Sequence, residues 1–361
     1  MIKTARNFLF LLCSINVSAQ FHTLKMPERS NYVQETQSLG VTDITITYHS
    51  PQVRGRDVWN TPGIIPKGGD PIPWRAGANM NTTMSFSTDV MIDGKLLPKG
   101  TYGFHIIPNE NGYELLFAHN NNQWGSYYLE EKEDVTLRVV VQDVSCAFSE
   151  KLDYEFIPKD DSTVIIGLEW AEKRIPFGVS VNLKETVIAS FRSELRGINT
   201  YRWEAWNDAA KWCLDNDTNL EEALVWVNRS INGGYNGFAQ NKNFTNLLTK
   251  AKIEKALQME DEFLRSLSEA ITLDFSPYAS HVAIQDFLGE ELNEQALLVS
   301  NKAIKKHPNV WYVNRNHGLS LYHNGEQKKG IKYLELSREK APEIYVSRLD
   351  ELILKAKEGT I

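Results

Sequence analysis

The chain has 361 residues, of which 42% are apolar and 24% charged, and this globular composition excludes a chain that is disordered, collagen-like or of low complexity throughout. Its length exceeds what one ordinary hydrophobic core accommodates, so we expect two domains. Thirty-nine basic against 46 acidic residues give a net charge of −7, which argues against nucleic acid or an anionic membrane as the main partner.

The first twenty residues have the pattern of a secretory signal peptide. Lys3 and Arg6 form a basic start, FLFLLCSI at 8–15 is apolar, and VSA at 17–19 supplies small or modest residues before a cleavage site. We therefore predict a signal peptide over residues 1–19 and a periplasmic or secreted mature protein. In the rest of the chain no apolar run approaches the roughly 18 residues of a membrane span, so no such span is expected.

The cysteines are too few for a disulfide framework. A lipoprotein anchored through Cys13 is disfavoured, because Leu12 stands where a lipobox has a small residue. Cleavage would remove Cys13 and leave Cys146 and Cys213, which fall in different predicted domains. We expect two free, buried thiols that pack as small apolar residues.

From about residue 40 to 185 apolar and polar side chains alternate, which is the period of half-buried β-strands. The clearest runs lie at 44–48, 83–87, 135–141 and 164–170. The dipeptide Asp93-Gly94 and the loop Pro108–Gly112 both have the composition of hairpin turns. Seven or eight such strands predict an antiparallel β-sandwich or a related jelly-roll-like or barrel fold within residues 20–190.

The stretch 51–73 interrupts this pattern, because its four glycines and five prolines cannot form regular structure and predict a long ordered loop. It leads into PWRAGANMNTT at 73–83, where small residues surround an arginine, a tryptophan and two asparagines. Two interpretations stay open. Arg75 and Asn79 either satisfy buried carbonyls and hold the loops together, or they face a ligand.

From about residue 198 the apolar period becomes helical. Small residues that fit helix crossings, and the prolines that follow them, recur 34 residues apart: Ala296/Ala303 and Gly330/Ser337, then Pro308 and Pro342. A helix–turn–helix period of this length resembles tetratricopeptide repeats. We predict a tetratricopeptide-like solenoid over residues 198–361, with a loop insertion at 232–237. An irregular helical bundle is the alternative.

Motifs of familiar catalytic or cofactor sites do not occur in the sequence. It contains no GxSxG, HExxH, P-loop, CxxC or dinucleotide fingerprint, so we expect no cofactor. A metal site is also not expected. With Pro108–Gly112 as the hairpin loop, His105 faces Leu115, and His119 lies four residues further along the partner strand, roughly 13 Å away.

Five residues of the predicted β domain form the candidate site: Arg56, Arg75, Asn79, His105 and Trp124. The two arginines flank the Pro/Gly-rich stretch, His105 is polar within an apolar strand, and Trp124 follows an asparagine tract. We predict that the five converge on one side of the domain. Cationic donors, an amide and an indole would suit a carboxylate- or sugar-bearing ligand.

Several longer segments resemble a known bacterial family, domain of unknown function 2911: SPQVRGRDVW, PWRAGANMNTTMSFSTDVMIDGKLLPKGTYGFHIIP, NNNQWGSYYLEEKEDVTLRVVV and LEWAEKRIPFGVSVN. The resemblance covers about residues 40–185 and extends into YRWEAWNDAAKWCLDNDTNLEEALVWVNRSI of the helical half. It implies an exported protein, often with a helical annex. It carries over no catalytic residue, because the family has no assigned activity.

The sequence thus predicts an exported two-domain α+β protein of the cell envelope. We expect a non-catalytic ligand- or protein-binding or scaffolding protein, because solenoids present concave surfaces and β-sandwiches carry ligand loops. Its partner would be a protein, a peptide or a small anionic or sugar ligand. The alternative is an envelope hydrolase that acts on glycan or peptide, which two groups with oppositely perturbed titration in one cleft would favour.

Overall fold

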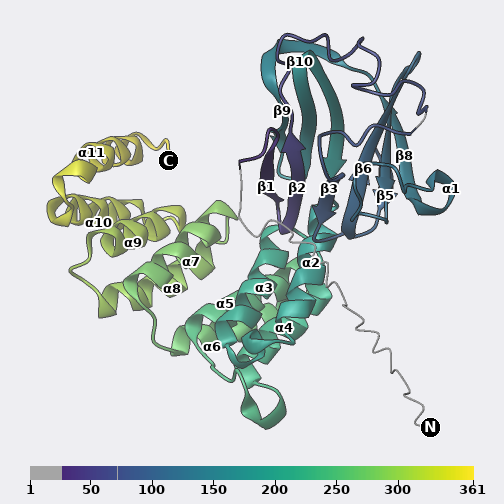
Figure 1. Ribbon diagram of the computed structural model, residues 1–361. Helices are drawn as coiled ribbons and strands as arrows, with labels where there is room; N and C mark the ends of the chain where they lie inside the picture. The colour runs from purple at the N-terminus through teal and green to yellow at the C-terminus, as the bar shows by residue number, and fades with distance from the viewer. Residues whose placement is uncertain (1–26, 71) are drawn as a thin grey trace, which may run out of the picture. The chain divides into compact units, whose positions relative to one another are not determined.

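The computed structural model describes residues 27–70 and 72–361, so the predicted signal peptide lies outside the described residues. The chain divides into two compact units after Val181. The first, called here the β unit, consists mainly of antiparallel strands, and the second, the helical unit, is all-α (Figure 1). The predicted α+β organisation, antiparallel sheets followed by helices, is confirmed.

The β unit contains two antiparallel sheets. The first has the order β1-β2-β3-β6-β7-β8, with bounds β1 Asn31–Leu39, β2 Thr42–Ser50, β3 Thr82–Phe86, β6 Gly100–Asn109, β7 Gly112–Ala118 and β8 Val135–Val141. The second has the order β5-β4-β10-β9, with bounds β5 Lys95–Leu97, β4 Val90–Ile92, β10 Thr163–Ser180 and β9 Val144–Asp160. A short helix α1 (Glu131–Asp134) precedes β8.

The two sheets bury one shared core, because their alternating apolar side chains point to the same interior. In β2, buried and partly exposed positions alternate, as the sequence period predicts. Phe104 of β6 lies 5.2 Å from Phe117 of β7 and 5.7 Å from Phe177 of β10, measured between ring centroids. Aromatic contacts of this kind join the sheets at their centre.

The Asp93-Gly94 turn joins β4 and β5 as predicted, and both residues have positive φ. The second hairpin differs from the prediction, because β6 continues to Asn109 and Pro108 pairs with Tyr113. Pro108 is tolerated there because its carbonyl bonds to Gly68 N at 2.8 Å and not to β7. The N–H and C=O of one strand residue point to the same side, so the missing N–H of Pro108 removes no hydrogen bond between β6 and β7. His105 therefore faces Leu116 instead of Leu115.

The long stretch before β3 is an ordered excursion that contributes to the core. Val53, Val58 and Ile65 are buried in the shared core, and Trp59 packs against it. The Trp59 indole N–H donates to the Trp170 carbonyl at 3.0 Å. A segment without regular structure is held here by apolar burial and a few hydrogen bonds.

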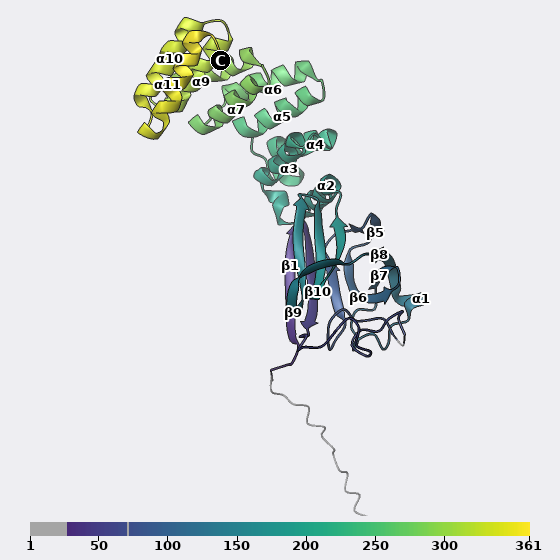
Figure 2. The same cartoon turned by 90° about the horizontal axis from the view of Figure 1, so that it is seen from above.

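The helical unit is a series of helix pairs, and Figures 1 and 2 both show α9, α10 and α11 side by side. Its elements are α2 Leu183–Glu194, η1 Ile198–Tyr201, α3 Trp203–Asp215, α4 Leu220–Asn232, η2 Tyr235–Gly237, α5 Phe244–Ala256, α6 Glu260–Thr272, α7 Pro277–Gly289, α8 Asn293–Lys306, α9 Trp311–His323, α10 Gln327–Lys340 and α11 Glu343–Glu358. None of the helices in the described ranges is long and apolar enough to cross a membrane.

The 34-residue period of the sequence is present in the helices themselves. Helices α7 and α9 begin at Pro277 and Trp311, which are 34 residues apart. Helices α8 and α10 begin at Asn293 and Gln327, so both members of the pair repeat after 34 residues. The predicted small residues of these pairs, Ala296, Ala303, Gly330 and Ser337, are all buried. The repeat prediction is confirmed for these two pairs, and the loop with η2 lengthens the connection between α4 and α5.

Both cysteines of the described chain are free thiols. Cys213 is buried in the helical core, as predicted. Cys146 is only partly buried, because it lies on β9, the last strand of its sheet, where much of the strand is exposed. Burial raises the pKa of both thiols, so neither is activated as a nucleophile.

Candidate functional site

The loop that carries Arg75 is held at both ends by strand-like contacts. At one end Trp74 and Ile106 exchange backbone hydrogen bonds of 2.9 and 2.8 Å, and at the other Met80 pairs with Trp124. Between these points Asn79 has a positive φ of 58°, a conformation that asparagine tolerates better than most residues. The loop therefore presents Arg75 in one defined place.

Arg75, Asn79 and Trp124 come together through Gly125. The Arg75 Nη1 group donates to the Asn79 carbonyl, which also accepts from Gly125 N at 3.1 Å. A Cβ on Gly125 would lie 2.5 Å from Arg75 Cζ, and its φ is +64°. Gly125 is therefore the residue type that allows the guanidinium to lie against this loop.

Three large aromatic side chains stand exposed on the same loop. Trp124 is 54% exposed, Tyr127 61% and Tyr128 72%. The Arg75 Cζ atom lies 5.6 Å from the centre of the Tyr127 ring, within the range of a cation–π contact. The two tyrosines were not among the predicted residues, although the sequence WGSYY contains them directly after Trp124. We call Arg75, Asn79, Trp124, Tyr127 and Tyr128 the Arg75 surface.

His105 lies beneath this surface, with no exposed area. Its Nδ1 atom is 2.7 Å from the Ser126 hydroxyl oxygen, and its Nε2 atom has no hydrogen-bond partner among the described residues. Burial lowers the pKa of His105 to about 4, assisted by the positive charge of Arg75 and opposed by Asp134. The imidazole is therefore neutral at neutral pH. Its hydrogen bond with Ser126 holds the loop that carries Trp124.

Within the described chain, Arg56 makes no hydrogen bond to the other four predicted residues. Its guanidinium donates to the carbonyls of Gln52 and Val53, at 2.6 and 3.0 Å. No hydrogen bond or ion pair among the described residues joins it to Arg75, His105 or the loop of Trp124. The structure thus brings Arg75, Asn79, His105 and Trp124 together and uses Arg56 to close a local turn.

Residues near the start of the described chain border the Arg75 surface. The Asn79 amide donates to the Glu28 carboxylate at 3.1 Å, and His49 Nε2 lies 3.4 Å from the same carboxylate. The rings of Tyr32 and His49 meet edge to face at 5.6 Å. Glu28 therefore pairs with Asn79 and His49, and no ion pair of the described chain neutralises Arg75.

The chemistry that this arrangement offers is recognition through stacking and N–H donors. Ser126 and His105 are hydrogen-bonded like a nucleophile and its base, but Ser126 is only 1% exposed and cannot meet a substrate from solvent. The described residues contain no cluster of three or more His, Cys, Asp or Glu side chains that could hold a metal ion. The exposed groups of this surface are the aromatic side chains, and Arg75 lies partly exposed beside them.

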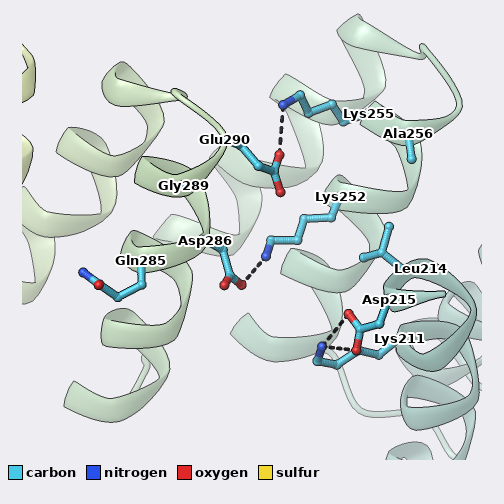
Figure 3. Close-up of a pocket in the computed structure, with 10 residues that line it drawn as sticks. All are labelled: Lys211, Leu214, Asp215, Lys252, Lys255, Ala256, Gln285, Asp286, Gly289 and Glu290. Carbon is cyan, nitrogen blue, oxygen red and sulfur yellow. Dashed lines mark hydrogen bonds and ion pairs between the residues drawn. The ribbon is translucent and has the colours of Figure 1, made fainter. Parts of the chain in front are cut away.

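The helical unit has a pocket of its own, with a volume of about 680 Å³. Its lining residues, drawn in Figure 3, belong to α3, α5 and α7, the first helices of three successive pairs, and to Glu290 directly after α7. Charged side chains line it in ion pairs: Lys211 with Asp215 at 2.6 Å, Lys255 with Glu290 at 3.0 Å, and Lys252 with Asp286. The lysines and carboxylates of the pocket thus neutralise one another.

Residues 30–179 match the model of a family described as "Protein of unknown function (DUF2911)", which confirms the resemblance for the β unit. No curated protein matches the chain. Since the matched family has no assigned function, the activity has to be inferred from the chain itself.

Solved structures that are similar to this chain at low identity include two proteins, MamA and YrrB. One is the "Crystal structure of MamA protein", with 14% identity, 42% of this chain and 80% of that chain covered, and a TM-score of 0.30. The other is the "Crystal structure of YrrB: a TPR protein with an unusual peptide-binding site", with 13% identity, 47% and 84% covered, and a TM-score of 0.30. The description of the helical unit as a repeat comes from its own 34-residue period.

Proposed function

We propose that the β unit is a non-catalytic binding module whose Arg75 surface takes a saccharide that carries a carboxylate. The observation that supports this most directly is the group of three exposed aromatic rings beside a guanidinium that has no carboxylate partner in the described chain. Aromatic side chains and arginine together are the residue types that contribute most at binding surfaces. The exposed aromatic rings would be covered by the ligand.

The aromatic residues would contribute stacking. Trp124, Tyr127 and Tyr128 lie within five consecutive positions, and each residue is more than half exposed. A tryptophan or tyrosine combines a flat apolar face with a polar edge, which matches a sugar ring with its apolar face and peripheral hydroxyls. Clustered exposed aromatic area of this kind typically marks an interaction site.

Arg75 would contribute the charge recognition. Its Nη1 group is bound to the Asn79 carbonyl, which orients the guanidinium without neutralising it. A guanidinium held in place can donate two parallel hydrogen bonds to a carboxylate, and little side-chain entropy is lost when the ligand binds. This supports an acidic saccharide over a neutral one.

Alanine substitution at Trp124 or Tyr127 is expected to weaken the binding of an oligogalacturonate at least tenfold, as the loss of a stacking contact at the centre of an interface does. Isothermal titration calorimetry of the full chain measures this, with a neutral oligogalactose of equal length as the ligand control. Because both side chains are exposed, the thermal midpoint should stay within about 1 °C of the parent.

The matched protein control is Phe148→Ala, which removes an aromatic side chain that is 57% exposed on β9. It should leave the affinity unchanged. Equal affinity of the parent and the Trp124 and Tyr127 variants would contradict the proposed site. Equal binding of the acidic and neutral oligosaccharides would remove the role of Arg75 in recognising charge.

We further propose that the protein is exported and works in the cell envelope or outside the cell, which the basic, apolar and small-residue segments at the N-terminus support. Protein recovered from the periplasm or medium is expected to begin at Gln20. Intact-mass spectrometry of that material checks this, and a mass that still includes residues 1–19 would contradict cleavage at the predicted site.

A further inference from the structure

The short helix η1 and the connection between α4 and α5 carry large apolar side chains that lie in solvent. In η1 Ile198 is 73% exposed and Tyr201 54%, and in the connection Tyr235 is 78% and Phe238 39% exposed. None of the four is part of the apolar core formed by the described residues of this unit. Figure 1 shows the connection extending past the ends of the neighbouring helices. Clustered apolar area that the fold does not bury typically marks an interaction site.

The two segments lie against each other. The rings of Tyr201 and Phe238 meet edge to face, with 4.8 Å between their centroids. Ile198 precedes Tyr201 by three residues, and side chains three apart share one face of a 3₁₀-helix. The carbonyl of Tyr235 accepts from Phe238 N at 3.2 Å, which holds these two residues in one turn. We call Ile198, Tyr201, Tyr235 and Phe238 the η1–η2 surface.

The connection between α4 and α5 holds its aromatic side chains on an ordered backbone. Gly233, Asn236 and Gly237 have positive φ of 72°, 55° and 74°, a conformation that glycine and asparagine tolerate best. Gly234 N donates to the Phe238 carbonyl at 3.1 Å, and Gly237 N donates to the Gly234 carbonyl at 2.8 Å. The loop insertion that the sequence predicted is therefore a built feature that presents aromatic side chains to solvent.

A guanidinium without a counter-charge lies between the two segments. Arg229 Cζ is 5.2 Å from the centre of the Trp206 ring, and the Trp206 N–H donates to the Thr200 carbonyl of η1 at 3.1 Å. A Cβ on Gly234 would coincide with the Arg229 guanidinium, so the loop backbone lies directly against it. Within the described chain Arg229 forms no ion pair, and its buried Nε atom has no hydrogen-bond partner. The cation thus adjoins both η1 and the loop.

The segments around the η1–η2 surface are positively charged. Residues 196–202 include two exposed arginines, Arg196 and Arg202, and no acidic residue, and residues 232–243 contain a lysine and no acidic residue. One carboxylate, that of Glu194 at the end of α2, accepts from an amide of η1 at 3.4 Å. The two segments are therefore net positive, although the net charge of the whole chain is −7.

We propose that the η1–η2 surface docks on a lipid bilayer that carries anionic headgroups. The four apolar side chains would enter the headgroup region, and the neighbouring arginines would lie against lipid phosphates. Tyrosine suits this depth because its ring is apolar and its hydroxyl polar, and no hydrogen bond within the described chain uses the hydroxyl of Tyr201 or Tyr235. Apolar tips that project from a loop, with cations beside them, match a bilayer surface in both hydrophobicity and charge. This site is separate from the Arg75 surface and does not depend on it.

Tyr235→Ser tests the docking, because it removes the most exposed ring of the surface. The chain is produced from Gln20 onward, since the apolar segment 8–15 would itself bind lipid. It is sedimented with sucrose-loaded vesicles of phosphatidylcholine and phosphatidylglycerol in equal parts, and with vesicles of phosphatidylcholine alone. The parent is expected to bind the mixed vesicles, and Tyr235→Ser to lower the partition coefficient about tenfold. Arg202→Gln should lower it about fivefold, as the loss of one cation near an anionic surface does.

The matched control is Tyr278→Ser, which removes a tyrosine of α7 that is 68% exposed and lies outside the surface. It should leave vesicle binding unchanged, and all three variants should keep the thermal midpoint of the parent because the altered side chains are exposed. The proposal is overturned if the parent stays in the supernatant with the mixed vesicles, if both kinds of vesicle bind equally, or if Tyr278→Ser weakens binding as much as Tyr235→Ser. It is also overturned if light scattering shows a parent dimer that Tyr235→Ser dissociates, because the surface would then join two copies of the chain.

Discussion

Replacing Gly330 by alanine is expected to destabilise the helical unit by about 3 kcal/mol, at the upper end of the usual cost of overpacking. Gly330 of α10 faces Gly318 of α9 where the two helices cross. A Cβ on Gly330 would lie 2.6 Å from the Gly318 carbonyl oxygen and 3.0 Å from Tyr322 N. Both neighbours are backbone atoms, so the helices themselves would have to move apart.

Thermal unfolding followed by circular dichroism measures this effect, which corresponds to roughly 6–12 °C for a domain of this size. The matched control is Gly289→Ala, at the end of α7, where a Cβ would meet nothing within 4 Å. That change should be neutral or stabilise by up to about 1 kcal/mol, because alanine favours helix more than glycine does. Similar midpoints for the two variants would show that α9 and α10 do not cross this closely.

Acidification is expected to lower the free energy of unfolding of the β unit by about 3 kcal/mol through His105 alone. The pKa of His105 is about 4 in the folded chain, against 6.5 for an unperturbed histidine. Between these values the unfolded chain binds the proton and the folded chain does not. The stability linked to the neutral His105 is therefore complete above pH 6.5, and it is lost progressively as the pH falls from 6.5 through about 4.

Urea unfolding at pH 7 and at pH 4.5, followed by tryptophan fluorescence, compares the free energy of unfolding of the parent with that of His105→Gln. The glutamine variant loses the titrating group, so its stability should change less between the two pH values, whatever its stability at pH 7. His119→Gln is the control, because that histidine is 63% exposed beside Asp134. If the parent and His105→Gln lose the same free energy on acidification, the buried, neutral state of His105 is wrong.

The order of elements and the two periods could be predicted from the sequence, because they depend on local patterns. Alternation in β2 and the Asp93-Gly94 turn correspond to the structure directly. The predicted β6–β7 register is wrong by one position, because the prediction placed Pro108 in the hairpin loop and the structure places it in β6. A proline's effect depends on whether its missing N–H faces a partner, and only the packed sheet decides that.

The candidate site was predicted in part for a similar reason. Arg75, Asn79 and Trp124 were found because small residues, amides and aromatic side chains gather in their segments, and Gly125 brings them into contact. Arg56 has the same composition around it but bonds only to its own turn. The residue type shows that an arginine side chain needs hydrogen-bond acceptors, and only the fold decides which acceptors lie within reach of it.

The sequence by itself determined the α+β order, the 34-residue repeat and the resemblance of the β unit to a known family, because periodicity, turn composition and motif spacing are properties of neighbouring residues. Tertiary structure decided which polar groups are paired. Lys252 pairs with a carboxylate of α7, and His105 is buried while Tyr127 is exposed. Charge pairing and burial depend on residues distant in the chain, so they exist only once the elements have packed.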